Sequence, residues 1–192
     1  VKTHPLEHTT EMDTVYNSQI GPFIQTFIFE NTGLMIGFLH KEKTSVSMAS
    51  TLDKLQEILE DDYYTHFSLL LTDRGSEFEK YDLFENNYQT DEARGHIFYC
   101  DPQRPDQKPH VENNHNLVRN ILPNKRNLDK LTQEDLNLMF SHINSVPRAS
   151  LGGRTPYEVF TYFYGDDVLK KLNIQKIEKD MVTLQPYLLK IK

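Results

Sequence analysis

Three carboxylates stand where they could hold a divalent metal ion. Asp73 follows the apolar run Leu69–Leu71, at the point where a buried strand would leave the core. Asp13 lies inside a strand-like segment, and Glu112 lies at the start of a predicted helix. Magnesium prefers oxygen ligands, usually takes one or two protein carboxylates, and leaves room for water and phosphate oxygens. These acids therefore suggest a metal site that acts on phosphate, and two ions about 3.5–4 Å apart could activate the attacking oxygen and stabilise the leaving one.

The predicted helix over residues 111–122 carries further polar groups on one face. Glu112, His115, Asn116 and Arg119 are spaced at i, i+3, i+4 and i+7, so they lie on the same side of the helix. A carboxylate for metal and a cation for phosphate on one face make chemical sense together. The spacing therefore supports the hypothesis of a phosphate-handling site.

Each acid also has an ordinary interpretation. Taken alone, Asp73 followed by Arg74 and Gly75 fits a strand-ending turn. Asp13 alone fits a polar residue on the open face of an antiparallel strand, and Glu112 alone fits a first-turn acid that complements the helix dipole. The metal hypothesis depends on the three acids converging at one edge of a sheet, which requires the first and fourth strands to be neighbours.

The elements that must position these acids follow from the hydrophobic pattern. Three strands with short links predict an antiparallel meander, and a fourth strand that follows a helix should return parallel to an earlier one. Threonines at 132 and 155, each followed three residues later by an acid, predict helix starts. The order predicts an α/β layer sandwich with a mixed sheet. Strands are expected at 12–16, 23–29, 34–40, 67–72 and 96–100, and helices from 45 to about 60, within 79–95, over 111–122, and after 132 and 155.

Composition and length bound the class of protein. The 192 residues, 38% hydrophobic and 26% charged, suit one soluble domain, and we expect a core over 1–165 with a C-terminal tail over 166–192. No apolar stretch could span a bilayer and no signal-peptide pattern opens the chain, so a cytoplasmic location is expected. The single cysteine, Cys100, excludes an internal disulfide and a Cys-rich zinc site. Because the chain begins at Val1, we expect it to be a piece of a longer protein.

The net charge of −7 argues against a dedicated nucleic-acid-binding module, which would usually be basic. It does not exclude an enzyme that works on nucleic acid, because catalytic carboxylates and their metal ions offset each other locally. Local cations would then contact phosphate, and the candidates are Lys108, Arg119, Lys125, Arg126 and Arg148.

Six segments spread over nearly the whole chain share one family pattern: EMDTV (Glu11 to Val15), LTDRGSEF (Leu71 to Phe78), FYCDP (Phe98 to Pro102), QK with VENNHNLVRNILP (Gln107 to Pro123), LTQEDLNLMFSHINSVPRASLGGRTPYEVF (Leu131 to Phe160) and VTLQPYLLK (Val182 to Lys190). In these segments the chain resembles the catalytic core of bacterial insertion-sequence transposases of the insertion-sequence-thirty type, which have a retroviral-integrase-type Asp-Asp-Glu core. The resemblance implies an RNase H-like three-layer fold with a five-stranded mixed sheet flanked by helices.

The resemblance also implies a site and a reaction. Asp13, Asp73 and Glu112 become the catalytic and metal-binding residues, with two Mg²⁺ or Mn²⁺ ions expected. Water would attack a phosphodiester at the transposon end, and the freed 3′-hydroxyl would then attack target DNA. The nucleic-acid contacts are expected from one set of residues: Lys108, His115, Asn116, Arg119 and Arg148.

The expected partner is double-stranded DNA, both transposon ends and target, with no membrane partner. A homo-oligomer is expected in the active complex, in the bacterial cytoplasm at the nucleoid, and the family's N-terminal DNA-recognition domain is expected to lie outside this chain. The chain departs from the expected family pattern at Arg74 and Pro109. These departures leave open a catalytically inactive RNase H-like DNA-binding or assembly module of a decayed element. A purely hydrolytic nuclease is a further alternative, which the sequence does not distinguish.

Overall fold

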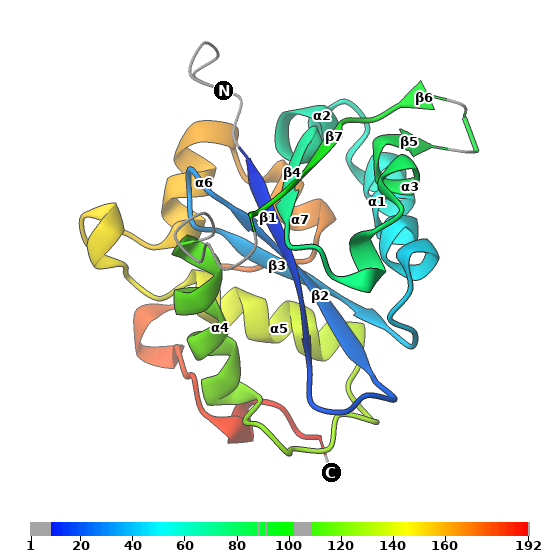
Figure 1. Ribbon diagram of the computed structural model, residues 1–192. Helices are drawn as coiled ribbons and strands as arrows, with labels where there is room; N and C mark the ends of the chain where they lie inside the picture. Colours follow the sequence, from blue (N-terminus) through cyan, green and yellow to red (C-terminus); the bar gives the residue numbers. More distant parts are fainter. Residues whose placement is uncertain (1–8, 88, 91, 102–108, 192) are drawn as a thin grey trace.

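The computed structural model describes residues 9–87, 89–90, 92–101 and 109–191, with side chains in the last range described from Asn114 onward. Its centre is a five-stranded sheet with strand order β3-β2-β1-β4-β7 (Figure 1). The strands are β1 (Thr10–Tyr16), β2 (Phe23–Phe29), β3 (Met35–His40), β4 (Leu69–Thr72) and β7 (His96–Tyr99). β1, β2 and β3 form the predicted antiparallel meander, whereas β4 pairs parallel to both β1 and β7.

Helices cover both faces of this sheet, which makes the predicted three layers. α4 and α5 lie side by side on one face, where α4 contacts β1 and α5 contacts β3; α1 and α3 lie on the other face (Figure 1). The helices are α1 (Ser45–Leu59), α2 (Asp62–Phe67), α3 (Tyr81–Glu85), α4 (Pro109–Ile121), α5 (Gln133–Asn144), α6 (Pro156–Tyr164) and α7 (Asp167–Lys171).

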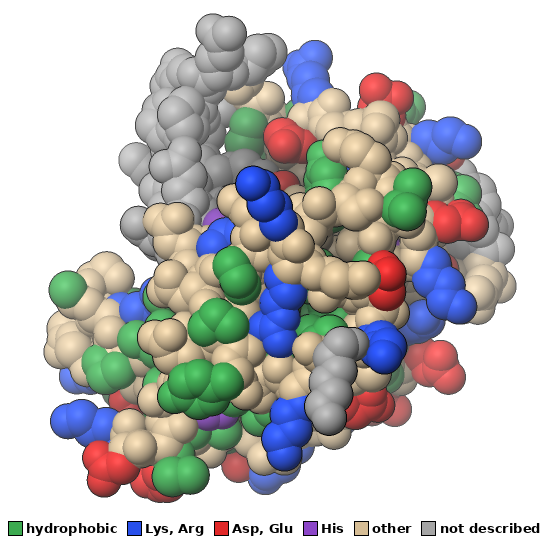
Figure 2. All heavy atoms as spheres, turned by 90° about the horizontal axis from the view of Figure 1, so that it is seen from below, with side chains coloured by type: hydrophobic (Ala, Val, Ile, Leu, Met, Phe, Trp, Pro, Cys, Tyr) green, Lys and Arg blue, Asp and Glu red, His purple; other side chains and the backbone are tan. Residues whose placement is uncertain are grey.

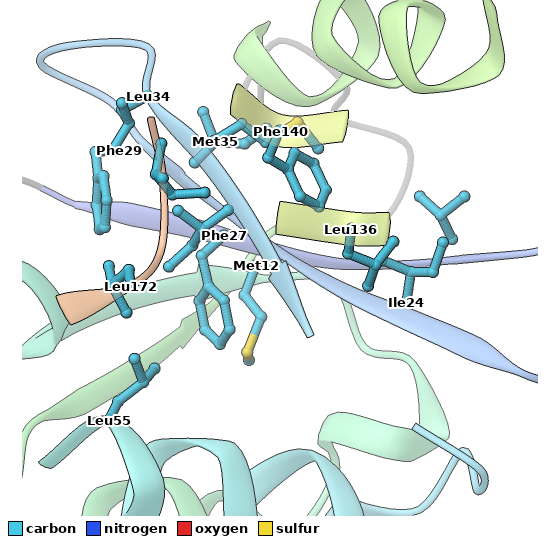
Figure 3. Close-up of a cluster of buried hydrophobic side chains, with 14 of the residues drawn as sticks. Met12, Ile24, Phe27, Phe29, Leu34, Met35, Leu55, Leu136, Phe140 and Leu172 are labelled. Atoms are coloured by element: carbon cyan, nitrogen blue, oxygen red, sulfur yellow. The ribbon is translucent and has the colours of Figure 1, made fainter. Parts of the chain in front are cut away.

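The core is built on β2, the strand that is buried along its whole length. A strand covered on both faces needs a continuous apolar run, and FIQTFIF comes close to one. Figure 3 shows Leu55 of α1 packing from one side of the sheet and Leu136 and Phe140 of α5 from the other. Gly37 in β3 allows this close approach, because a Cβ there would lie 2.3 Å from the Phe140 ring.

Local signals in the sequence account for the helix starts. Thr132 and Thr155 each accept a hydrogen bond from the backbone three residues on, and the acid at that position bonds back to the threonine N–H, as a capping box requires. Thr44 caps α1 by accepting from the Ser47 N–H. These predicted starts are confirmed.

The structure corrects the start of the fourth strand and adds a helix and a hairpin. The predicted strand at 67–72 begins only at Leu69, because the preceding residues form the short helix α2, which buries Tyr63 and Phe67. The polar segment before β7 contains the predicted short helix and also a two-stranded hairpin, β5 (Asn86–Asn87) with β6 (Glu92–Ala93).

The expected C-terminal tail packs closely on the rest of the molecule. It begins with the short helix α7, and its apolar side chains Val168, Leu169, Leu172 and Leu189 are buried in the same hydrophobic cluster as the sheet. Two serines accept hydrogen bonds from its backbone: Ser141 Oγ from the Gln175 N–H and Ser145 Oγ from the Ile177 N–H, both at 2.9 Å. None of the described helices combines the length and apolar character needed to cross a membrane.

Candidate metal and nucleic-acid site

Asp13 lies in the middle of β1, and Asp73 directly follows the last residue of the neighbouring strand β4. β1 and β4 run parallel with Thr10 opposite Leu70 and Glu11 opposite Leu71, a register that places position 13 level with position 73. The Thr72 hydroxyl donates to the Met12 carbonyl at 2.9 Å, which ties the end of β4 to β1 just before the two acids. The neighbouring strands that the metal hypothesis required are therefore present.

Asp13 is partly buried and faces α4. Its Oδ1 accepts a hydrogen bond from the Thr14 N–H at 2.7 Å, and its Oδ2 lies 4.0 Å from His115 Nε2. Both side chains keep about a fifth of their surface exposed, 22% for Asp13 and 23% for His115. The predicted polar face of the helix is thus turned, at His115, toward the first acid.

Asp73 lies on the surface, in the turn that follows β4. Its Oδ1 accepts from the Gly75 N–H at 2.9 Å, which closes a turn in which the aspartate side chain bonds its own backbone two residues on. Gly75 has an ordinary φ of −60°, so space rather than conformation demands glycine here. A Cβ at Gly75 would lie 3.0 Å from Asp73 Oδ1 and 2.6 Å from Glu77 Oε2.

Glu112 lies in the first half of α4, but its side chain is outside those that the structure describes. Position 112 precedes His115 by three residues in the same helix, so the two positions share a face. The third predicted ligand therefore stays a prediction. Lys108 lies outside the described residues altogether.

Arg119 joins α4 to the end of β1. Its guanidinium donates to the Asn17 side chain and to the Tyr16 carbonyl, the latter at 3.2 Å. Burial lowers the pKa of Arg119. These internal bonds give Arg119 a role in positioning α4, and its contact with nucleic acid stays a prediction.

Arg148 and Asn116, the remaining predicted nucleic-acid contacts, have different surroundings. Arg148 donates to the Asn114 side chain at 3.0 Å and to the Ile143 carbonyl at 3.4 Å, and burial lowers its pKa. It lines a cavity of about 280 Å³ together with Asn114. Asn116 is exposed on α4.

Arg126, which the sequence offers as a phosphate contact, is used inside the protein. It donates to the carbonyls of Ile121, Pro186 and Leu189, at 3.0, 2.7 and 2.8 Å, and so fixes the C-terminal segment to the end of α4. Figure 2 shows one face of the molecule on which Lys and Arg side chains are interspersed with acidic and hydrophobic ones. This face does not present a broad basic surface, in keeping with the net charge of −7.

The sequence did not single out Glu77 and Lys43, which lie beside the Asp73 turn. Glu77 is 4% exposed, and its Oε1 lies 3.1 Å from the Lys43 ammonium. The ammonium also lies 4.8 Å from the centre of the Tyr16 ring. Burial alone would lower the pKa of Lys43, but Glu77 and Tyr16 raise it on balance. Only the acid within LTDRGSEF could have drawn attention to this pair.

The donors at this end of the sheet suit a hard cation. Carboxylate oxygens favour Mg²⁺ or Mn²⁺ over softer metals. Among the described side chains, no group of three or more His, Cys, Asp or Glu is close enough to hold a metal ion. A complete site of the predicted kind would therefore need Glu112. A buried oxygen of Glu77 that lacks a hydrogen-bond partner among the described residues adds to the fit, because a cation nearby would offset its charge.

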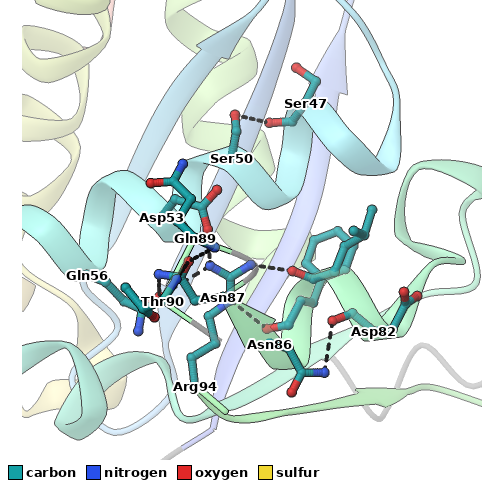
Figure 4. A network of polar contacts seen from close by, with 12 residues as sticks. Ser47, Ser50, Asp53, Gln56, Asp82, Asn86, Asn87, Gln89, Thr90 and Arg94 are labelled. Atoms are coloured by element: carbon teal, nitrogen blue, oxygen red, sulfur yellow. Dashed lines mark hydrogen bonds and ion pairs between the residues drawn. The ribbon is translucent and has the colours of Figure 1, made fainter. Parts of the chain in front are cut away.

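A second polar cluster, at α1 and the β5–β6 hairpin, contrasts with this site (Figure 4). Arg94 is 2% exposed and forms an ion pair with Asp53. It also donates to the Gln56 side chain at 3.3 Å and to the carbonyls of Leu83 and Phe84. Its guanidinium is thus enclosed by acceptors from α1 and α3.

Comparison with known proteins relates the chain to transposases. The transposase InsI of insertion sequence element IS30A from Escherichia coli is 38% identical over 63 residues, which make up 33% of this chain and 16% of that transposase. The transposase of insertion sequence element IS1086 from Cupriavidus metallidurans is 33% identical over 63 residues, or 19% of its length. The matched stretch thus spans less than a fifth of these curated relatives. No family model matches the chain.

Solved structures agree in fold. The integrase catalytic core domain of HTLV-2, in complex with magnesium, superposes with a TM-score of 0.55 at 17% identity, over 80% of this chain and 95% of that one. The catalytic core domain of BIV integrase superposes with a TM-score of 0.55 at 23% identity, over 82% of this chain and 95% of that one. The fold is RNase H-like. Together, the two kinds of similarity support a transposase catalytic core.

Proposed function

We propose that this chain is the catalytic core of a transposase that cleaves DNA at transposon ends and joins it to target DNA with the help of two divalent ions. The observation that carries the proposal is the level placement of Asp13, within β1, and Asp73, just after the parallel strand β4, with α4 turned toward Asp13. An RNase H-like fold and sequence similarity to transposases support the same reaction class.

Each residue of the site has its own role in this proposal. Asp13, Asp73 and Glu112 would hold Mg²⁺ or Mn²⁺, which would supply activation of the attacking oxygen and stabilisation of the leaving one. His115 lies 4.0 Å from Asp13 and limits where that carboxylate can turn. Arg119 keeps α4 against the end of β1 through Asn17 and the Tyr16 carbonyl.

Contacts to DNA are the second part of the proposal. Asn116 is exposed on the same helix, and Arg148 lines a cavity near its start. With Lys108, His115 and Arg119, these residues would bind the phosphates on either side of the cleaved bond. Because the chain itself is acidic, most of the affinity for DNA would come from a separate DNA-recognition domain and from a homo-oligomeric complex on two DNA ends.

The test uses the full-length protein with labelled transposon-end DNA. Asp73→Asn and Glu112→Gln should each abolish magnesium-dependent cleavage, while Asp166→Asn, an exposed acid paired with Lys170, should leave it unchanged. Cleavage retained in either of the first two variants would disprove the assignment.

Two further outcomes separate the alternatives. Pre-cleaved ends that fail to join target DNA, in a protein that still cuts, would indicate a hydrolytic nuclease. A protein that neither cuts nor responds to metal would be an inactive module. Arg74, one motive for that alternative, is exposed and forms no ion pair with any residue that the structure describes, so it leaves the Asp73 charge in place.

A further inference from the structure

Glu77 is a buried acid that the proposed mechanism does not use. It lies in the short 3-10 helix Ser76–Phe78 that follows the Asp73 turn and is 4% exposed. Lys and Glu side chains are almost never fully buried unless they are paired, and Lys43 supplies a partner for only one of its oxygens. The other oxygen, Oε2, is buried and has no hydrogen-bond partner among the described residues.

The geometry of the turn brings Glu77 Oε2 close to Asp73, the predicted metal ligand in this loop. Glu77 Oε2 and Asp73 Oδ1 lie 2.6 and 3.0 Å from one and the same point, the position that a Cβ on Gly75 would occupy. Negative charges held close together repel each other. A cation beside both acids would relieve the repulsion, and Lys43 pairs with the other oxygen of Glu77, Oε1, at 3.1 Å.

The loop that carries both acids is fixed by two hydrogen bonds from other elements and one of its own. Ser45 Oγ, at the start of α1, donates to the Ser76 carbonyl at 3.3 Å. The Tyr99 hydroxyl of β7 donates to the Phe78 carbonyl at 2.5 Å, and the Phe78 N–H donates to the Gly75 carbonyl at 2.8 Å. The backbone therefore cannot swing out to separate the two carboxylates without breaking these bonds.

We propose that Glu77 is an auxiliary carboxylate of the metal site, which raises the affinity of Asp73 for a divalent cation by the negative charge of its open oxygen. Lys43 pairs with the other oxygen, Oε1, and is the only cation in an ion pair with Glu77 among the described residues. This inference rests on the proposed function, because it assumes that Asp73 binds metal. It makes Glu77 a positioning residue that acts through Asp73.

The experiment measures manganese binding to the unmodified chain and its variants by electron paramagnetic resonance of the free ion, together with thermal unfolding without metal. Glu77→Gln keeps the size of the side chain and removes its charge, so the dissociation constant for Mn²⁺ should rise by about tenfold or more, as for other residues behind metal ligands. Unfolding without metal should change little, because Lys43 is 26% exposed and can turn to solvent.

Two variants show whether charge or structure is responsible. Asp53→Asn removes another acid from a pair with a buried cation, Arg94, and should lower the melting temperature without weakening Mn²⁺ binding. Lys43→Met removes the competing cation and keeps Glu77, so Mn²⁺ should bind at least as tightly as in the unmodified chain. If the Lys43–Glu77 pair were purely structural, Glu77→Gln and Lys43→Met would instead weaken Mn²⁺ binding equally.

The failures are distinguishable. An unchanged dissociation constant in Glu77→Gln, with binding intact in the unmodified chain, overturns the inference alone. No manganese binding to the unmodified chain overturns the proposed metal site, and the inference with it.

Discussion

The Arg94 cluster and the Asp73 turn use charged side chains in opposite ways. Arg94 is 2% exposed and is surrounded by Asp53, Gln56 and two backbone carbonyls. Asp73 is exposed, accepts from its own loop at Gly75, and has Glu77 beside it with an oxygen that lacks a partner among the described residues. A charge enclosed by partners stabilises the fold, whereas neighbouring charges of one sign that remain open are what a cation can bind.

The difference gives a rule for this molecule. Cations that the sequence offers for DNA, such as Arg119 and Arg126, are already bonded to backbone carbonyls in the structure. Substitutions of such groups should change stability and leave metal binding intact. Substitutions of the open acids should weaken metal binding and leave the free energy of unfolding nearly unchanged.

The largest loss of stability is expected from Arg94→Met. It leaves Asp53 without its cation and strips three acceptors of their donor, and breaking a buried ion pair costs about 3–5 kcal/mol. Urea denaturation of the purified chain measures the change, and manganese binding measured alongside should match the unmodified chain. Weakened manganese binding in a variant that remains folded would break the distinction between the two regions.

A pH-dependent loss is expected from His40. Burial first, and then the nearby charge of Lys54, lower its pKa from 6.5 to about 4, while its ring nitrogens bond Ser47, Gln25 and Thr51. The unfolded chain therefore takes up a proton below pH 6.5 that the folded chain refuses. Stability from this group is complete above pH 6.5 and falls by roughly 3 kcal/mol as the pH drops to about 4.

The measurement for His40 is the free energy of unfolding of the unmodified chain and of His40→Gln between pH 7 and 4. Glutamine does not titrate, so the free energy of unfolding of His40→Gln should fall by roughly 3 kcal/mol less than that of the unmodified chain over this pH range. Parallel curves would contradict the account, because they would show that the pKa of His40 is the same in the folded and the unfolded chain.

A smaller loss is expected from Arg126→Met. Three carbonyls, of Ile121, Pro186 and Leu189, lose their donor, and the segment 186–189 loses its link to the end of α4. Because the site is partly open to water, which can replace the bonds, the cost should be about 1–3 kcal/mol. Limited proteolysis should cut first within this segment; unchanged resistance would show that buried Leu189 alone holds it.

The smallest change in stability is expected from Asp73→Asn. The side chain is exposed and its bond to the Gly75 N–H can also be made by an amide, so the free energy of unfolding should change by less than about 0.5 kcal/mol. The rise in melting temperature on adding manganese should disappear, since only a ligand of the folded state produces it. A full rise in this variant would remove Asp73 from the site.

The sequence was sufficient for the layout of the sheet because its signals there are local. Alternating and apolar runs marked the strands, and a helix between the third and fourth implied the parallel return that places Asp13 level with Asp73. It could not predict α2, because that helix follows a turn at Glu60 with φ 55°, a conformation that no glycine or asparagine announced. Buried Phe67 fits a strand and a helix equally well by pattern.

The site was predictable only in part for a similar reason. Asp13 could be picked out by its place within a strand, Asp73 by its place after one and Glu112 by its place near a helix start, and their joint role as metal ligands stays a prediction. The Lys43–Glu77 pair joins residues 34 positions apart and depends on how the Asp73 turn packs against the start of α1. Likewise, the bonds from Arg119 to Tyr16 and Asn17 exist only once α4 lies on β1. Contacts of this kind depend on tertiary packing, which spacing in the sequence does not encode.

The most direct test of the central claim is a crystal of this chain soaked in manganese, with the anomalous signal of the metal recorded. The account predicts a peak between the carboxylates of Asp13 and Asp73, with Glu112 within ligand distance, and loss of that peak in Asp73→Asn. A manganese peak elsewhere with none at these acids, in crystals that leave this end of the sheet open to solvent, would contradict it.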